Sequence, residues 1–254
     1  MYLVKDKNTL SAKAADVKYD SSQGGAHIIP DVLYPAWSGL LTENTGHTFT
    51  DSSASAHAIT STTNAHHSGA IKKIGSTSLS LNKGLANTGS DHLYFGANNT
   101  DFQFGTGDFT IEGWVYPTAN DANKTVFSTN WGANGSILIT FSHPSAGGAG
   151  KFGFFDYTSS NGSPKVTTSN AYPINTWHHV AFVRNGTSHK FYINGIEDGT
   201  AGYSASDLTR DAFIFGAVYT NGTETFNGYM SDVRVYKGVA KYTSNFVVPA
   251  TSPD

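Results

Sequence analysis

The feature that most constrains the fold is an alternation of apolar and polar side chains in short segments. In FTIEGWVY, residues 109–116, Phe109, Ile111 and Val115 fall on one side of an extended chain together with Gly113. The other side carries Thr110, Glu112, Trp114 and Tyr116. Short segments of similar pattern recur six times later in the chain, at 136–141, 151–157, 177–184, 190–194, 212–219 and 228–236. Six Asn-Gly pairs punctuate this region, and Asn-Gly tolerates the positive φ of tight hairpin turns. We therefore predict antiparallel β-strands.

Length and composition indicate how these strands are arranged. The chain has 254 residues, and no helical pattern of ten or more residues interrupts the strands. One all-β, antiparallel two-sheet β-sandwich or jelly roll fits that length as a single domain. Cysteine is absent, so packing must stabilise the fold without disulfides. We predict a short N-terminal arm over residues 1–30 and a jelly-roll domain with a short C-terminal tail over residues 31–254.

The charge pattern argues against two classes of partner. The formal net charge is −3, and the basic residues are scattered, with no run longer than Lys72-Lys73. Nucleic-acid binding needs a concentrated positive field, so we expect no nucleic-acid partner. No apolar run reaches about 18 residues, so we expect no membrane span. The N-terminus also lacks the continuous apolar stretch of a secretory signal.

Histidines in residues 174–200 invite the hypothesis of a metal site. Neighbouring residues of a strand point to opposite faces, so His178 and His179 cannot both reach one ion. His189 lies near the following turn, several residues away. Zinc requires three or four convergent ligands. We therefore predict that these histidines serve to build a sheet.

Four ordered stretches resemble the laminin-G-like, concanavalin A-like jelly-roll domains. They are residues 47–68, 78–117, 176–200 (TWHHVAFVRNGTSHKFYINGIEDGT) and 226–249. The resemblance covers about residues 31–249, and it implies a jelly roll. The sequence VRVYKGVAKYTSNF, residues 233–246, is similar to that of copies of this domain in bacteriophage virion proteins.

The resemblance implies three classes of function. The first is a structural virion protein on the phage particle surface, most simply a capsid decoration or head-fibre protein bound to the major capsid protein or a tail component. In that role, residues 1–30 would order on docking and bury Tyr2, Leu3, Val4 and Leu10. The second is a tail-fibre or spike adhesin that binds a host surface glycan. Head or tail location and homo-oligomeric state are left open.

The third and least favoured class is a glycoside-active enzyme. Glycosidases use two carboxylates at a set separation. The chain has four glutamates, and none belongs to a Glu-x-Asp-x-x-Glu strand. A thiol nucleophile and a Gly-x-Ser-x-Gly elbow are also missing, although a dispersed Ser–His–Asp triad stays open. We predict that the chain is not an enzyme.

Aromatic residues in loops are the candidates for glycan binding. Trp131 lies within NWGANG, Tyr157 within DYTSSNG and Tyr219 within VYTNG. Each ring offers a face for a sugar to stack on. The alternative is that each covers an edge of the core, as aromatic residues at strand ends often do.

The resemblance also implies one calcium ion, held by an aspartate near the first strand. The chain reads Trp37-Ser38-Gly39 at that point, so the expected carboxylate is missing. Calcium prefers six to eight oxygen ligands, which leaves Asp51 and Asp232 as the candidate ligands. The alternative roles are turn capping for Asp51 and pairing with Arg234 for Asp232.

Overall fold

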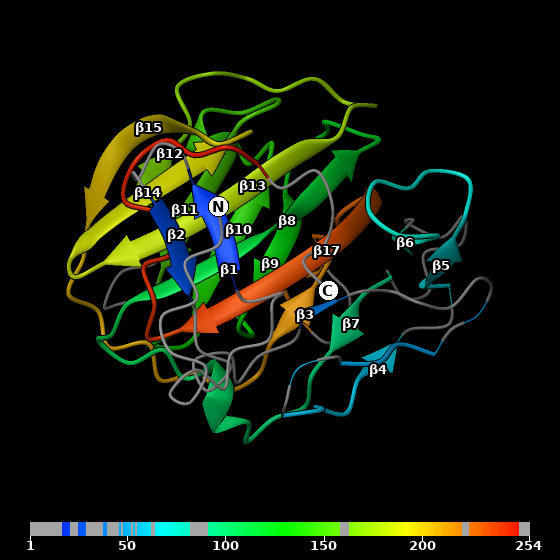
Figure 1. Cartoon of the computed structure of the whole chain (residues 1–254), viewed down its shortest axis with the longest axis horizontal. Coiled ribbons are helices and arrows are strands. Elements are labelled where there is room, and N and C mark those ends of the chain that lie inside the picture. The colour runs from blue at the N-terminus through cyan, green and yellow to red at the C-terminus, as the bar shows by residue number, and fades with distance from the viewer. Residues whose placement is uncertain are drawn as a thin grey trace.

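The computed structural model is a sandwich of two antiparallel sheets (Figure 1). It describes residues 17–20, 25–28, 38–39, 46, 48–51, 53, 55–61, 64–81, 91–157, 163–219 and 224–248. The predicted all-β sandwich is thereby confirmed. Among the described residues, no helix is long and apolar enough to span a membrane. The four residues that we predict to anchor the arm, Tyr2, Leu3, Val4 and Leu10, lie outside the described residues.

One sheet has eight strands. In spatial order they are β15 (Ile196–Tyr203), β14 (Ser188–Ile193), β13 (His178–Asn185), β8 (Phe109–Pro117), β17 (Gly228–Lys237), β6 (Ser78–Leu81) and β5 (His66–Ser68), with β3 (Ser38–Gly39) pairing β17. The other sheet has seven strands. Their order is β12 (Val166–Thr167), β11 (Phe152–Asp156), β10 (Ile137–Phe141), β9 (Lys124–Ser128), β16 (Ile214–Phe215), β7 (Leu93–Tyr94) and β4 (Thr60–Ser61).

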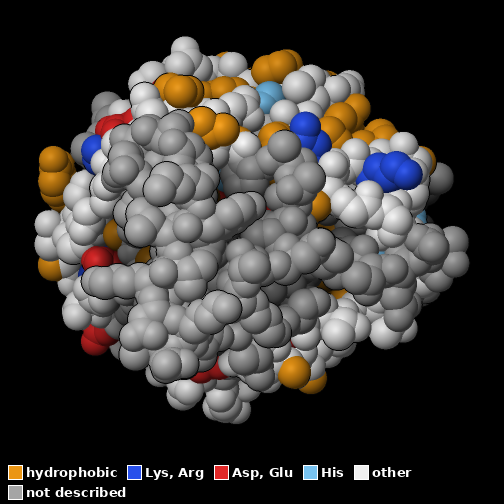
Figure 2. All heavy atoms as spheres, viewed as in Figure 1, with side chains coloured by type: hydrophobic (Ala, Val, Ile, Leu, Met, Phe, Trp, Pro, Cys, Tyr) orange, Lys and Arg blue, Asp and Glu red, His pale blue; other side chains and the backbone are white. Residues whose placement is uncertain are grey.

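Two short strands and two helical turns complete the described part of the chain. β1 (Val17–Asp20) and β2 (Gly25–Ile28) form a separate two-stranded sheet. The described helical turns are η4 (Thr100–Phe102) and η5 (Pro144–Ala146). On the face shown in Figure 2, the coloured Lys and Arg side chains lie as separate spots, so the described part of that face carries no large basic patch.

A phenylalanine-rich core fills the space between the sheets. β8 contributes Phe109, Ile111 and Val115, as the alternation predicts. Across the sandwich, the rings of Phe154 on β11 and Phe182 on β13 stack with centroids 3.9 Å apart. The predicted strand at 212–219 is much shorter, because Gly216 has a φ of +88° and ends β16 after two residues.

The histidines of β13 and β14 are structural, as predicted. His178 hydrogen-bonds through Nε2 to the carbonyl of Pro173, 2.9 Å away, whereas His179 packs edge-on against Trp114 on the opposite face. His189 is buried against the rings of Phe154 and Phe182. Burial, assisted by the nearby positive charge of Arg184, lowers the pKa of His189 to about 4.

This buried imidazole predicts acid sensitivity. Between pH 6.5 and pH 4, His189 takes up a proton in the unfolded chain but not in the folded one, so the free energy of unfolding should fall as the pH drops through this window. The full loss corresponds to about 3 kcal/mol. Urea unfolding of the wild type and of His189→Leu, measured at pH 7 and pH 4.5, should show a smaller loss in the variant. His66→Gln, at a half-buried site on β5, is the control, and an unchanged loss in His189→Leu would contradict the assignment.

Candidate functional site

A pocket of about 240 Å³ opens on the outer face of the seven-stranded sheet. β10 directs Ile137, Ile139 and Phe141 into the core, so Leu138 faces outward. On β11, Phe155 faces outward in the same way. Together with Val218, which follows β16, Leu138 and Phe155 form an apolar floor. The pocket is therefore built on the side of the sheet that faces away from the core.

Two half-buried aromatic rings form walls of this pocket. Trp131 comes from the loop between β9 and β10, and Tyr219 follows β16. The ring of Tyr157 packs edge-on against Trp131, with centroids 5.4 Å apart. The structure thus brings together all three aromatic residues singled out in the sequence. Tyr157 packs against Trp131 and supports its ring, whereas Trp131 and Tyr219 line the pocket.

Glycines allow the Trp131 loop to adopt its shape. Gly132 has a φ of +106°, and the hydroxyl of Tyr219 lies 3.5 Å from the place where a Cβ would be. At the end of the loop, the N–H of Gly135 donates to the carbonyl of Tyr157 over 2.9 Å. The N–H of Tyr157 in turn donates to the carbonyl of Ser136 over 2.8 Å. The loop is therefore tied to the end of β11.

His143 and Glu224 add polar groups to the lining of the pocket. The backbone N–H of Ser145 donates to Nδ1 of His143 over 3.2 Å, and burial lowers the pKa of this imidazole. Glu224 is exposed at the rim, and its carbonyl accepts from the N–H of Thr125 over 3.0 Å. Partial burial raises the pKa of the Glu224 carboxyl. Nothing in the local sequence marks either residue, because only the tertiary fold brings them to the aromatic rings.

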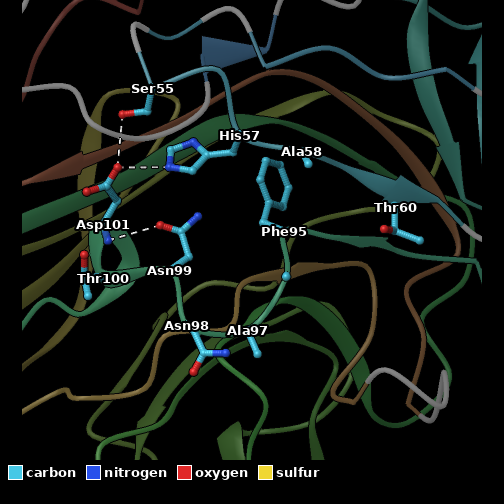
Figure 3. Close-up of a pocket in the computed structure, with 11 residues that line it drawn as sticks. Ser55, His57, Ala58, Thr60, Phe95, Ala97, Asn98, Asn99, Thr100 and Asp101 are labelled. Carbon is cyan, nitrogen blue, oxygen red and sulfur yellow. Dashed lines mark hydrogen bonds and ion pairs between the residues drawn. The ribbon is translucent and has the colours of Figure 1, made fainter.

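A second, shallower pocket of about 610 Å³ is lined by residues of 55–60 and 95–101 (Figure 3). His57 connects two carboxylates there, through Nδ1 to Asp51 at 2.5 Å and through Nε2 to Asp101 at 3.0 Å. The hydroxyl of Ser55 donates to Asp101 over 3.0 Å. Because Ser55 points to Asp101 and not to His57, this group lacks the Ser–His contact of an activated nucleophile.

The two aspartates predicted as calcium ligands have other partners. Asp51 is buried and accepts hydrogen bonds from the N–H and hydroxyl of Ser53, both at 2.8 Å, which is the turn-capping alternative. Asp232 accepts from Nε and Nη2 of Arg234 at 2.9 and 2.7 Å. Within the described part of the chain, no three His, Cys, Asp or Glu side chains are grouped to hold a metal ion. The described residues thus give the calcium prediction no support.

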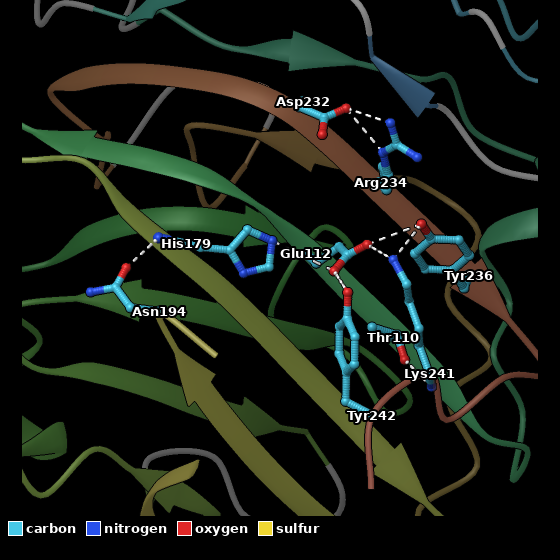
Figure 4. Close-up of polar contacts among 9 residues, drawn as sticks. All are labelled: Thr110, Glu112, His179, Asn194, Asp232, Arg234, Tyr236, Lys241 and Tyr242. Carbon is cyan, nitrogen blue, oxygen red and sulfur yellow. Dashed lines mark hydrogen bonds and ion pairs between the residues drawn. The ribbon is translucent and has the colours of Figure 1, made fainter. Parts of the chain in front are cut away.

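Glu112 lies in a closed network on the outer face of the eight-stranded sheet (Figure 4). It is only 2% exposed, and it accepts hydrogen bonds from the hydroxyls of Tyr236 at 3.0 Å and Tyr242 at 2.7 Å. The ammonium of Lys241 also donates to it, and Nε2 of His179 is 3.6 Å away. A carboxylate enclosed in this way holds the C-terminal segment and is not presented to a substrate.

The other described glutamates have separate surroundings. Glu197 on β15 pairs with Lys190 on β14 over 2.9 Å, and Glu224 lies at the rim of the aromatic pocket. Glu43 lies outside the described residues. Glu224 is the only carboxylate among the residues that line that pocket.

The Asp51–His57 contact predicts a large loss of stability on substitution. His57→Phe should lower the free energy of unfolding by about 3 kcal/mol, because it removes the imidazole that hydrogen-bonds to the buried Asp51 carboxylate. Asp101→Asn should cost about 1 kcal/mol or less, because the Asp101 side chain is 33% exposed. Urea unfolding at pH 7 measures both. Equal, small losses would show that the N–H and hydroxyl of Ser53 and the backbone N–H of residue 57 satisfy Asp51 without the imidazole.

Comparisons with known proteins agree with this architecture. The family model of the concanavalin A-like lectin/glucanases superfamily matches residues 87–241. Among solved structures, the binding domain of botulinum neurotoxin serotype C1 is 14% identical, with a TM-score of 0.55, over 80% of this chain and 49% of that one. The binding domain of botulinum neurotoxin DC in complex with SialylT is 14% identical, with a TM-score of 0.54, over 75% and 45%.

Domain 4 of an extracellular arabinanase from Geobacillus stearothermophilus, in complex with arabinotriose, is 18% identical, with a TM-score of 0.49, over 80% of this chain and 89% of that one. The chain spans about half the length of the neurotoxin binding domains it matches. No curated protein sequence matches it significantly. At such identities the neurotoxin domains show a shared fold, and the family model covers more than half of the chain. The protein therefore belongs to the concanavalin A-like lectin/glucanase superfamily.

Proposed function

We propose that this domain binds a carbohydrate in the pocket lined by Trp131, Tyr219, His143 and Glu224. The observation that carries the proposal is the convergence of two half-buried aromatic rings from separate loops above an apolar floor. Ligand sites are concave and largely apolar, with a few polar groups that fix orientation. A sugar presents an apolar ring face and a rim of hydroxyls, which matches this combination of surfaces.

Structural relatives support this proposal. The neurotoxin DC binding domain is described in complex with SialylT, and cell entry of botulinum neurotoxin type C is described as dependent on interaction with two ganglioside molecules. Those ligands belong to the relatives. The fold that this chain shares with them is compatible with glycan binding.

The same pocket favours binding without cleavage. Glycoside hydrolysis uses a pair of carboxylates that flank the scissile bond. Glu224 has no second carboxylate beside it among the residues that line the pocket. We therefore propose a binding module and not a hydrolase.

We further propose that the protein is located on a phage particle, as a decoration protein or a host-attachment adhesin. This proposal rests on the similarity of residues 233–246 to sequences in phage virion proteins. Immuno-gold labelling of purified particles with an antibody against residues 31–249 tests it. Label over the shell supports decoration, and label at the tail supports the adhesin. Absence of label from all particles would contradict both.

Trp131→Ala should weaken glycan binding at least tenfold, because it removes an aromatic wall of the pocket. The loss of about 1.4 kcal/mol of stacking free energy corresponds to a tenfold lower affinity. The measurement is binding of the purified chain to an array of neutral and acidic oligosaccharides. Trp177→Ala is the matched control, because Trp177 is also half-buried but packs against Tyr116 of the other sheet. Equal binding by the wild type and both variants, or no binding by the wild type, would refute the proposed site.

A further inference from the structure

We infer that the aromatic pocket selects uncharged glycans and discriminates against acidic ones. This inference rests on the proposed function and specifies its ligand class. It comes from the charge of the pocket: among the lining residues, the carboxylate of Glu224 is the only formally charged group. The remaining lining residues are apolar, aromatic or, in the case of Ser145, a neutral hydroxyl.

His143 does not supply a positive charge to this pocket. Its Nδ1 accepts the N–H of Ser145, and its ring packs against Phe155 with centroids 4.8 Å apart. Burial lowers the pKa of the imidazole, which keeps the ring neutral at pH 7. With Nδ1 acting as the acceptor, the neutral ring carries its proton on Nε2. His143 therefore offers a hydrogen-bond donor to a hydroxyl without the charge that would pair with a carboxylate.

The adjoining loops add no charge in their sequences. Residues 129–135 carry Trp131 and contain no Asp, Glu, Lys or Arg. Residues 158–162 follow Tyr157, and residues 220–223 connect Tyr219 to Glu224. These two segments lie outside the described residues, and both consist only of Thr, Ser, Asn and Gly. No cation from these three segments can therefore offset the Glu224 carboxylate.

An acidic sugar would bring a second negative charge close to Glu224. Two like charges about 5 Å apart weaken binding about fourfold in bulk water and by more than about a hundredfold in the lower dielectric near a protein surface. Because Glu224 is exposed and salt screens its charge, we expect an effect between these limits, on the order of tenfold. A neutral sugar avoids this repulsion, and its hydroxyls can donate to Glu224 and accept from Nε2 of His143. The volume of about 240 Å³ is below the range of pockets for drug-sized ligands, so it suits one or two sugar rings.

Affinity gel electrophoresis with neutral and acidic polysaccharides tests this selectivity. The neutral probes are dextran, galactan and mannan, and the acidic probes are polygalacturonate and polysialic acid. The wild type should be retained by at least one neutral polymer, with acidic polymers bound at least tenfold more weakly. Glu224→Gln should reduce this discrimination about tenfold. Glu197→Gln, which changes an exposed glutamate on β15, is the matched control and should leave the discrimination unchanged.

The outcomes separate this inference from the proposed function. Preferential retention by acidic polymers that is lost in Trp131→Ala would overturn the selectivity and leave glycan binding at this pocket intact. Discrimination against acidic polymers that survives in Glu224→Gln would also overturn the inference, because the charge would not be its cause. If no polymer retains the wild type, or if Trp131→Ala binds normally, both the inference and the proposed site are wrong.

Discussion

The pairing of β10 with β11 determines which side chains can form a pocket on the seven-stranded sheet. Ile139 lies opposite Phe154, and both face the core, whereas Leu138 lies opposite Phe155, and both face outward. A slip of one residue in one strand would exchange the inward and outward sets. The phenylalanine core therefore holds the register that also places the floor of the pocket, so the stability of the fold and the shape of the candidate site have a common origin.

The two outer faces of the sandwich differ in what covers them. On the eight-stranded sheet, the C-terminal segment packs Tyr242 and Phe246 as stacked rings beside Tyr192. Glu112 is buried beneath it, and two tyrosine hydroxyls and Lys241 compensate for the loss of solvent. Removing one partner would leave a buried charge, so this network favours a fixed cover. On the seven-stranded sheet, separate loops supply Trp131 and Tyr219 and leave a concave opening between them.

Sequence periodicity predicted the parts of the fold that depend on local alternation. It assigned both faces of β8 and the opposed directions of His178 and His179. β15 was not predicted, because IEDGTAGY mixes glycines and charges and has no regular apolar face. Its glycines have a tertiary role: a Cβ on Gly202 would lie 2.3 Å from the carbonyl oxygen of Lys165 near β12. Only the packing of one sheet edge against the other reveals that constraint.

In the candidate site, too, the sequence predicted local features but not those that depend on tertiary packing. Loop position and ring chemistry were enough to select the three aromatic residues, but not to show that Tyr157 braces Trp131. His143 and Glu224 became candidates only through the fold. The contacts of Asp51 with His57 and Ser53 favour the turn-capping alternative for this residue. In each case, residues that are far apart in the sequence lie close together in the fold. A single sequence contains no periodic signal for such tertiary contacts.

The chemistry of the aromatic pocket also determines how its affinity should respond to solvent. Salt screens interactions between exposed charges over about 8 Å at physiological ionic strength. Stacking on Trp131 and Tyr219, and hydrogen bonds to a neutral His143, do not depend on a net attraction between charges. Repulsion between Glu224 and an acidic ligand does depend on charge. Added salt should therefore leave the binding of neutral glycans nearly unchanged and should weaken only the discrimination against acidic ones.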